Sequence, residues 1–134
     1  MHPFRAAVEA RDHAAIEALL ADNVVFTSPV AFKPYPGKAI TAAILRAVIQ
    51  VFEDFRYVRE IGEDDARDHA LVFEASVDGK KLTGCDFLHL DDDGKIDELM
   101  VMVRPLSAAT ALAAAMGERF EQIRAEAAAQ LSSQ

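Results

Sequence analysis

The sequence predicts an α+β domain in which helices cover one face of a curved antiparallel sheet. Apolar residues recur at helical spacing near both ends of the chain and over residues 38–52. Four consecutive strand-like segments lie between residues 55 and 103, and Asp78-Gly79 between two of them is a hairpin signal. Helices separated in this way from a run of strands indicate an α+β layer arrangement. A length of 134 residues suits a single domain, with a core over about residues 4–105 and an added C-terminal helix.

Local signals place the helices. Pro3 suits the first position of a helix, and Asp12 is a candidate cap for a second short helix. Residues 38–52 carry an apolar stripe, and residues 106–131 have apolar side chains at spacings of three and four. Gly117 weakens the middle of this last helix and is a candidate position for a bend.

Prolines and glycine-containing turns bound the strands. Residues 23–28 form a strand that Pro29 ends, and the proline-rich stretch 32–37 is expected to be a loop. The four meander strands are predicted over residues 55–61, 69–77, 82–90 and 96–103.

Composition excludes several classes of function. The net charge of −8 and a pI near 4.9 argue against binding to nucleic acid or to an anionic membrane. No apolar run approaches the roughly 18 residues of a membrane span. Cys85 is the only cysteine, so no internal disulfide is possible, and this fits a cytoplasmic protein.

The last meander strand is apolar on both faces, which indicates that both faces are covered. Leu99, Val101 and Val103 share one face, and Met100 and Met102 share the other. Helices can cover the inner face only. We expect a second copy of the protein to cover the outer face as a homodimer; the alternative is that the C-terminal helix folds over it.

Several short motifs follow one another in an order typical of one superfamily. They are residues 20–26, Ser28-Pro29-Val30, Gly37 at the start of a helix, Asp86, residues 92–96 and Arg104-Pro105. Over about residues 4–105 the chain resembles the nuclear transport factor 2-like (NTF2-like) superfamily, in its SnoaL-like and ketosteroid-isomerase-like branch. The resemblance implies a cone-shaped (cystatin-like) fold whose sheet wraps around helices and leaves an apolar pocket. This fold hosts isomerases, cyclases, dehydratases, hydrolases and non-catalytic modules, so it does not define an activity.

The resemblance to ketosteroid isomerases can be followed residue by residue. Those enzymes use a carboxylate base, together with a tyrosine and a neutral aspartic acid that donate hydrogen bonds to the enolate. Asp86 matches the hydrogen-bond-donating aspartic acid, whereas Ser28 stands at the position of the base and Phe4 at that of the tyrosine. A serine hydroxyl is too weak a base for a carbon-bound proton. The sequence therefore argues against steroid isomerisation by that mechanism.

Asp86 is the main candidate for a functional side chain. It lies mid-strand on the face that carries Leu82, Leu88 and Leu90. A carboxylate there must be paired, hydrogen-bonded or protonated, so Asp86 is either a structural partner within the core or the acid or base of a pocket. Ser28 either binds a ligand oxygen, shares a proton with Asp86, or is satisfied by backbone. The predicted ligand-binding residues are Phe4, Phe26, Tyr57, Leu71, Phe73, Leu88 and Val101.

Other polar residues give weaker signals. Arg59 and Arg104 are minor candidates for pairing with Asp86, by resemblance to epoxide hydrolases of this fold. His89 alternates with Asp86 and is expected on the outer sheet face, and no histidine or cysteine pair has zinc-ligand spacing. We therefore expect neither a metal nor an organic cofactor.

Two functions are compatible with the sequence. One is an isomerase, cyclase or dehydratase that acts on a small apolar carbonyl metabolite through Asp86. The other is a non-catalytic ligand-binding or dimerisation module of the same fold.

Overall fold

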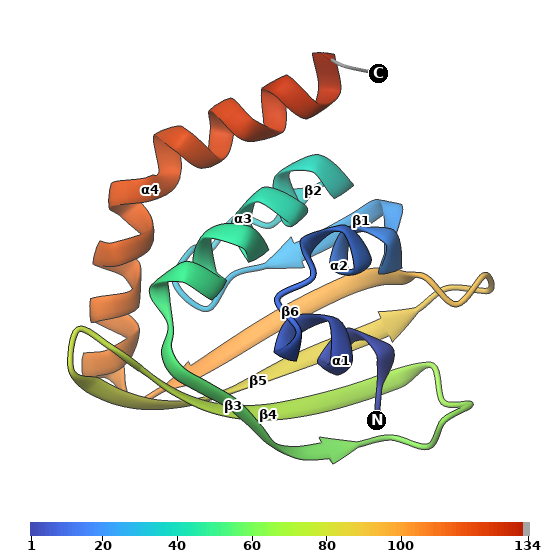
Figure 1. Ribbon diagram of the computed structural model, residues 1–134, viewed down its shortest axis with the longest axis horizontal. Helices are drawn as coiled ribbons and strands as arrows, with labels where there is room; N and C mark the ends of the chain where they lie inside the picture. Colours follow the sequence, from blue (N-terminus) through green and yellow to red (C-terminus); the bar gives the residue numbers. More distant parts are fainter. Residues whose placement is uncertain (133–134) are drawn as a thin grey trace.

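The computed structural model describes residues 1–132 of the chain as four helices and a six-stranded sheet (Figure 1). The helices are α1 (Pro3–Glu9), α2 (His13–Leu19), α3 (Lys38–Val51) and α4 (Leu106–Ser132). The strands are β1 (Leu20–Thr27), β2 (Tyr35–Pro36), β3 (Glu53–Ile61), β4 (Asp68–Val77), β5 (Lys80–Leu90) and β6 (Ile96–Arg104). This is the α+β class that the sequence predicts.

The sheet has the strand order β2-β1-β6-β5-β4-β3. Strands β3 to β6 form the predicted antiparallel meander. Strand β1 pairs parallel with β6, so the complete sheet is mixed. The stretch expected to be a loop contains β2, which pairs with Val25 and Phe26 of β1. A two-residue strand leaves no periodicity in a sequence, because only its pairing partner defines it.

The first two helices begin where the sequence predicted. Pro3 is the first residue of α1, and Asp12 caps α2 by accepting a hydrogen bond from the backbone N–H of Ala15 at 3.1 Å. Helix α1 ends in a Schellman arrangement. The N–H of Arg11 donates to the carbonyl of Val8, and that of Asp12 donates to Ala7, each at 3.0 Å.

The core lies between the sheet and the helices, which gather on one face of the sheet (Figure 1). Helix α1 contributes Phe4, which is almost fully buried. A cluster of rings packs below α3, with Phe73 at 5.0 Å from Phe55 and 5.5 Å from Phe52, measured between ring centroids. The ring of Tyr57 meets that of Phe55 edge-on at 4.9 Å. These rings fill one side of the interior and hold β3 against β4.

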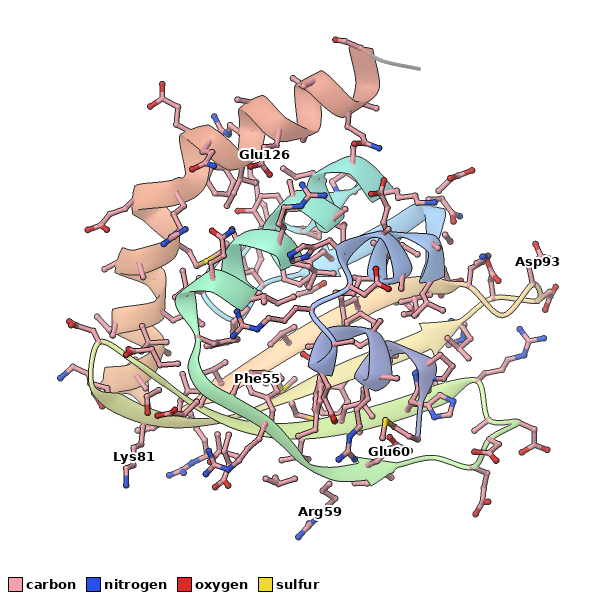
Figure 2. All side chains as sticks on the ribbon, in the orientation of Figure 1. Phe55, Arg59, Glu60, Lys81, Asp93 and Glu126 are labelled. Atoms are coloured by element: carbon pink, nitrogen blue, oxygen red, sulfur yellow. The ribbon has the colours of Figure 1, made fainter. Side chains whose placement is uncertain are left out.

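Helix α4 packs along α3 on the same side of the sheet, and it changes direction about half-way along (Figure 1). Arg46 of α3 pairs with Glu126 of α4 at 3.1 Å, and Figure 2 shows Glu126 on the upper part of this helix. The C-terminal helix therefore does not cover the outer sheet face. Within residues 1–132, neither α4 nor any other helix is long and apolar enough to cross a membrane.

The outer face of the sheet carries exposed apolar side chains on two neighbouring strands. Phe87 of β5 stands opposite Met100 of β6, and Cys85 stands opposite Met102. Phe87 and Met100 are each 38% exposed and Met102 is 53% exposed. This patch is what the alternation in β6 predicted for its outer side.

Gly84 provides a test of the packing around Phe73. A Cβ at Gly84 would lie 2.2 Å from Cζ of the Phe73 ring, so Gly84→Ala must displace that ring. We expect a loss of about 1–3 kcal/mol in the free energy of unfolding, measured by urea denaturation. Gly117→Ala is the matched control, because nothing lies within 4 Å of its Cβ position and alanine favours a helix interior by up to about 1 kcal/mol. Equal effects of the two substitutions would contradict the packing described.

Candidate ligand cavity and the Tyr57–Asp86 pair

A cavity of about 240 Å³ lies between the helices and the sheet. Its walls are largely apolar, which is typical of small-molecule sites. Four of the described residues that line this cavity have polar side chains: Ser28, Tyr35, Tyr57 and Asp86. A ligand in this cavity would meet few hydrogen-bonding groups, and one of these is a carboxyl group.

The structure brings most of the predicted site residues to this cavity. Those that line it are Phe4, Phe26, Ser28, Tyr57, Phe73, Asp86 and Val101. Leu71 and Leu88 are fully buried beside them but are not among the lining residues. They lie on the inner face as the alternation predicts, and close packing of the core leaves no open volume next to them.

Two walls of the cavity come from helices α3 and α4, whose residues were not among the site residues predicted from the sequence. Helix α3 and the segment after it contribute Ile44, Leu45, Val48, Ile49, Phe52 and Phe55. Helix α4 contributes Leu112, Ala113, Met116, Gly117 and Phe120. The apolar stripe of each helix was visible in the sequence, but a stripe does not say whether it faces solid core or a hollow.

Tyr57 and Asp86 form a buried hydrogen-bonded pair in the wall of the cavity. The Tyr57 hydroxyl donates to Oδ2 of Asp86 at 2.7 Å. Tyr57 is 7% exposed and Asp86 is 8% exposed. Strands β3 and β5 flank β4, and the pair reaches across it: Tyr57 stands opposite Phe73 and Asp86 opposite Leu71. The second carboxyl oxygen of Asp86 accepts no hydrogen bond from a side chain in the described part of the chain.

Burial sets the protonation behaviour of this pair. Loss of water around the carboxyl group raises the pKa of Asp86 from its ordinary 3.8 to about 7, and the hydrogen bond from Tyr57 opposes part of that rise. Burial and the neighbouring Asp86 raise the pKa of Tyr57 well above its ordinary value, so Tyr57 keeps its proton. Near neutral pH, Asp86 can therefore either take up or release a proton.

Ser28 lies at the end of β1 and lines the cavity. Its Oγ accepts a hydrogen bond from the backbone N–H of Val30 at 3.1 Å. This bond leaves the hydroxyl proton of Ser28 available to another acceptor. The two arginines considered as partners of Asp86 lie elsewhere: Arg59 points away from the core at the outer edge (Figure 2), and Arg104 is exposed and outside the cavity lining.

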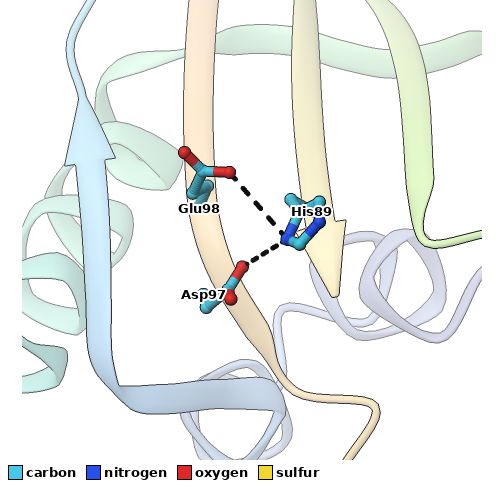
Figure 3. A group of neighbouring side chains, drawn as sticks. All are labelled: His89, Asp97 and Glu98. Carbon is cyan, nitrogen blue, oxygen red and sulfur yellow. Dashed lines mark hydrogen bonds and ion pairs between the residues drawn. The ribbon is translucent and has the colours of Figure 1, made fainter. Parts of the chain in front are cut away.

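His89 of β5 forms a separate cluster with Asp97 and Glu98 of the neighbouring strand β6 (Figure 3). The pairing of β6 shifts between His89 and Leu90, so that Asp97 is an extra residue between Ile96 and Glu98. Nδ1 of His89 lies 2.7 Å from Asp97 and 3.8 Å from Glu98. The hydrogen bond to Asp97 raises the pKa of His89. A hydrogen bond between the His89 imidazole and Asp97 accounts for this geometry, and the cluster has no part in lining the cavity.

The fold and the cavity together define a cone-shaped α+β domain with an acidic residue inside an apolar pocket. The family model of the SnoaL-like domain matches residues 2–99, and the chain belongs to this family. The resemblance predicted from the sequence is thus confirmed. No functionally curated protein matches the chain.

Solved structures extend the comparison. A protein from Pseudomonas aeruginosa described as a steroid delta-isomerase is 40% identical, with a TM-score of 0.84 over 91% of this chain and 89% of its own. An uncharacterised bacterial protein with a cystatin-like fold from Silicibacter pomeroyi is 35% identical, with a TM-score of 0.82 over 92% and 91% of the two chains. A putative ketosteroid isomerase from Kribbella flavida, at 21% identity and a TM-score of 0.61 over 77% and 73%, shares the fold.

The raised pKa of Asp86 predicts a specific dependence of stability on pH. Between the unfolded value near 3.8 and the folded value of about 7, the native protein holds a proton that the unfolded chain has released. Its contribution to stability is therefore complete below the lower value and is lost as the pH rises through about 7. Asp86→Asn has no such proton, so its free energy of unfolding should rise relative to wild type between pH 4 and pH 8.

Urea denaturation of wild type and Asp86→Asn between pH 4 and pH 8 measures the difference in their free energies of unfolding. The contributions of other titrating groups are the same in both proteins and cancel in this difference. Tyr57→Phe removes the hydrogen bond that lowers the pKa of Asp86. The stability that the Asp86 proton contributes should therefore be lost at higher pH in this variant. A constant difference between wild type and Asp86→Asn would show that Asp86 titrates as an ordinary carboxyl group.

Proposed function

We propose that the protein binds a small apolar carbonyl compound in the cavity and moves a proton on it through Asp86. One observation carries the proposal: the carboxyl group of Asp86, held by the Tyr57 hydroxyl at 2.7 Å, lies in the wall of an apolar cavity of about 240 Å³. A general acid or base works best when its pKa is near the working pH, and burial raises that of Asp86 to about 7.

The reaction can be written with this one carboxyl group. The Asp86 carboxylate removes a proton from the carbon next to the ligand carbonyl, the C–H electron pair moves into the enolate, and an O–H bond forms on Asp86. Return of that proton to another carbon of the conjugated system gives an isomer and restores the carboxylate. Apolar walls keep water away from the enolate, and Tyr57 orients the carboxyl group because its hydroxyl is already engaged with Oδ2.

Two other hydroxyl groups are candidates for holding the carbonyl oxygen. Ser28 keeps a proton to donate, since its hydrogen bond to Val30 uses the oxygen as acceptor. Tyr35 lines the same cavity, with its ring centroid 6.3 Å from Phe26 and 5.7 Å from Phe120. Either hydroxyl could stabilise the enolate oxygen, as donors near developing charge do.

The relative from Pseudomonas aeruginosa supports proton transfer on a carbonyl compound, because its description is that of a steroid delta-isomerase at 40% identity. The reaction class is therefore an isomerisation, with cyclisation and dehydration as related uses of the same group.

A non-catalytic ligand-binding module is the second candidate. It is favoured by the fact that Asp86 is the single carboxyl residue among the described residues that line the cavity. Such a protein would bind the apolar ligand and use the Tyr57–Asp86 pair to recognise its carbonyl oxygen.

Exchange of carbon-bound protons separates these candidates without knowledge of the natural substrate. We expect the protein to accelerate deuterium uptake by 2-tetralone in D₂O, followed by proton NMR with the buffer rate subtracted. Asp86→Asn should reduce the accelerated rate by about 100-fold or more, since it removes the general base. The wild-type rate should rise with pH through about 7, as Asp86 ionises.

Asp97→Asn is the matched control, because Asp97 carries the same functional group outside the cavity lining, and it should leave the rate unchanged. Isomerisation of 5-androstene-3,17-dione, followed by its ultraviolet absorbance, tests a steroid directly. Binding of 2-tetralone in a thermal-shift assay without any exchange would favour the non-catalytic module instead.

We also propose that two copies pair through the outer sheet face, at the patch formed by Phe87, Met100 and Met102. These side chains are exposed together on neighbouring strands, and a patch of this kind on both copies is self-complementary across a two-fold axis. Pairing would remove them from water and so stabilise the dimer.

Sedimentation velocity tests this assembly. The double variant Met100→Glu/Met102→Glu should be a folded monomer under conditions where the wild type is a dimer, because the new carboxylates would have to be buried at the interface. Ala114→Glu, on an exposed position of α4, is the control and should remain dimeric. A monomeric wild type at high concentration would reject the dimer.

A further inference from the structure

A second cavity, of about 310 Å³, lies next to the first and has a different chemistry. Its described lining consists of Arg5, Val8, Glu9, Arg11, Ile49, Phe55, Arg56 and Tyr57. Val8, Ile49, Phe55 and Tyr57 line both cavities. We call the second cavity the arginine groove. These four side chains form part of the wall of each cavity, and one of them, Tyr57, donates the hydrogen bond to Asp86.

The residues that line the arginine groove carry a net positive charge in an otherwise acidic protein. Three arginines and one glutamate line it, which gives 3 − 1 = +2 for its lining, whereas the whole chain carries −8. Glu60 and Glu74, which lie outside the lining, pair with Arg5 and Arg56 and balance this charge, so Arg11 is the arginine of the groove without an ion-pair partner among the described residues. A local cluster of guanidinium groups in an acidic protein is suited to a carboxylate or a similar anion.

The arginines retain donors for such an anion. Arg5 uses Nε toward Glu9 and Nη1 toward Glu60, and Arg56 uses Nη1 toward the Asp54 carbonyl and Nη2 toward Glu74. Each guanidinium has five N–H donors, so donors remain on both. The Arg56–Glu74 pair is exposed and the pairs of Arg5 are partly buried, so neither arginine is locked in a fully buried ion pair, and both can rearrange around a ligand.

Arg11 adds a feature that the fold alone does not require. It occupies the position after the cap of α1 with φ of +54°, where glycine or asparagine is normally favoured. No hydrogen bond or ion pair joins its side chain to another residue in the described part of the chain. The exposed side chain of Arg11 therefore lines the groove from a backbone position that glycine or asparagine would occupy with less strain.

Arg5 connects the arginine groove to the proton-transfer pair. Its guanidinium carbon lies 5.9 Å from the centroid of the Tyr57 ring, and the hydroxyl of that ring donates to Asp86. A ligand placed along this line would have its anionic end at the arginines and its apolar end in the cavity. The reverse orientation would bring its carboxylate against Asp86, which like-charge repulsion disfavours.

We propose that the arginine groove binds the carboxylate of an apolar ligand whose carbonyl-bearing part occupies the main cavity. The inference rests on the proposed function and narrows the ligand to an apolar keto acid or related carboxylate. Arg11 and Arg5 supply the charge-assisted hydrogen bonds, and the ligand crosses from one part of the site to the other beside Val8, Ile49, Phe55 and Tyr57, which line both.

Displacement of a neutral fluorescent probe tests this without knowledge of the ligand. N-phenyl-1-naphthylamine reports occupation of the apolar cavity, and 1-naphthaleneacetate and 1-naphthaleneacetamide compete for it with the same ring system and different charge. At pH 6, where Asp86 is mostly protonated, the acetate should displace the probe at about a five- to ten-fold lower concentration than the amide. Added salt should reduce this preference.

Arg11→Asn and Arg5→Gln should bring the two competitors to nearly equal potency against the probe. Asparagine tolerates the backbone conformation at residue 11, so Arg11→Asn should be at least as stable as wild type, and a loss of preference cannot come from unfolding. Arg67→Gln, which removes the same charge from an exposed pair with Asp92, should keep the wild-type preference.

The outcomes distinguish failure of the apolar cavity as a binding site from failure of the arginine groove as an anion site. If the probe does not bind, or if Val101→Glu in the cavity wall leaves its binding unchanged, the apolar site itself is wrong. If the probe binds in the cavity but acetate and amide compete equally in the wild type, or if Arg67→Gln abolishes the preference as fully as Arg11→Asn, the arginine groove is not an anion site and the proposed function stands without it.

Discussion

The hydrogen bond from Tyr57 to Asp86 is the interaction on which the interior of this domain depends. A carboxyl group that loses its water must be protonated or paired, and the nearest partner is a hydroxyl group that does not itself ionise. A cationic partner would have lowered the pKa of Asp86 and made it an inert carboxylate. A tyrosine opposes only part of the effect of burial, so the pKa of Asp86 stays near 7. The same contact that makes burial tolerable therefore leaves the pKa of Asp86 close to neutral pH.

Packing around Gly84 and Phe73 makes this contact possible. Gly84 stands opposite Phe73 in the sheet, and the missing side chain allows the Phe73 ring to lie over its backbone. That ring in turn meets Tyr57 edge-on at 6.2 Å, which limits how far the Tyr57 hydroxyl can move from Asp86. The glycine two residues before the acid thus supports the geometry of the acid through two aromatic rings.

The sequence predicted the elements well because most of their signals are local. Alternation in β4 and β5 placed Asp86 on the inner face, and Asp12 and Pro3 marked helix starts. The partner of Asp86 was not predictable, because β3 is irregular: its register shifts between Glu53 and Arg56 and again between Tyr57 and Arg59. Such shifts interrupt alternation. The parallel pairing of β1 with β6 and the cavity wall from α4 depend on contacts between distant segments, which periodicity does not encode.

In the proposed site, the two adjoining cavities would divide tasks that one cavity would combine with difficulty. A carboxyl group with a pKa near 7 requires surroundings that exclude water and other charges, whereas recognition of an anion requires charged donors, which bring water with them. Here Val8, Ile49, Phe55 and Tyr57 line both cavities, and none of the three arginines lines the cavity that contains Asp86. Tyr57 is the one shared residue that acts on both sides, with its hydroxyl on Asp86 and its ring below Arg5. A charged ligand end in the groove would thus orient the rest of the ligand without making the environment of Asp86 more polar.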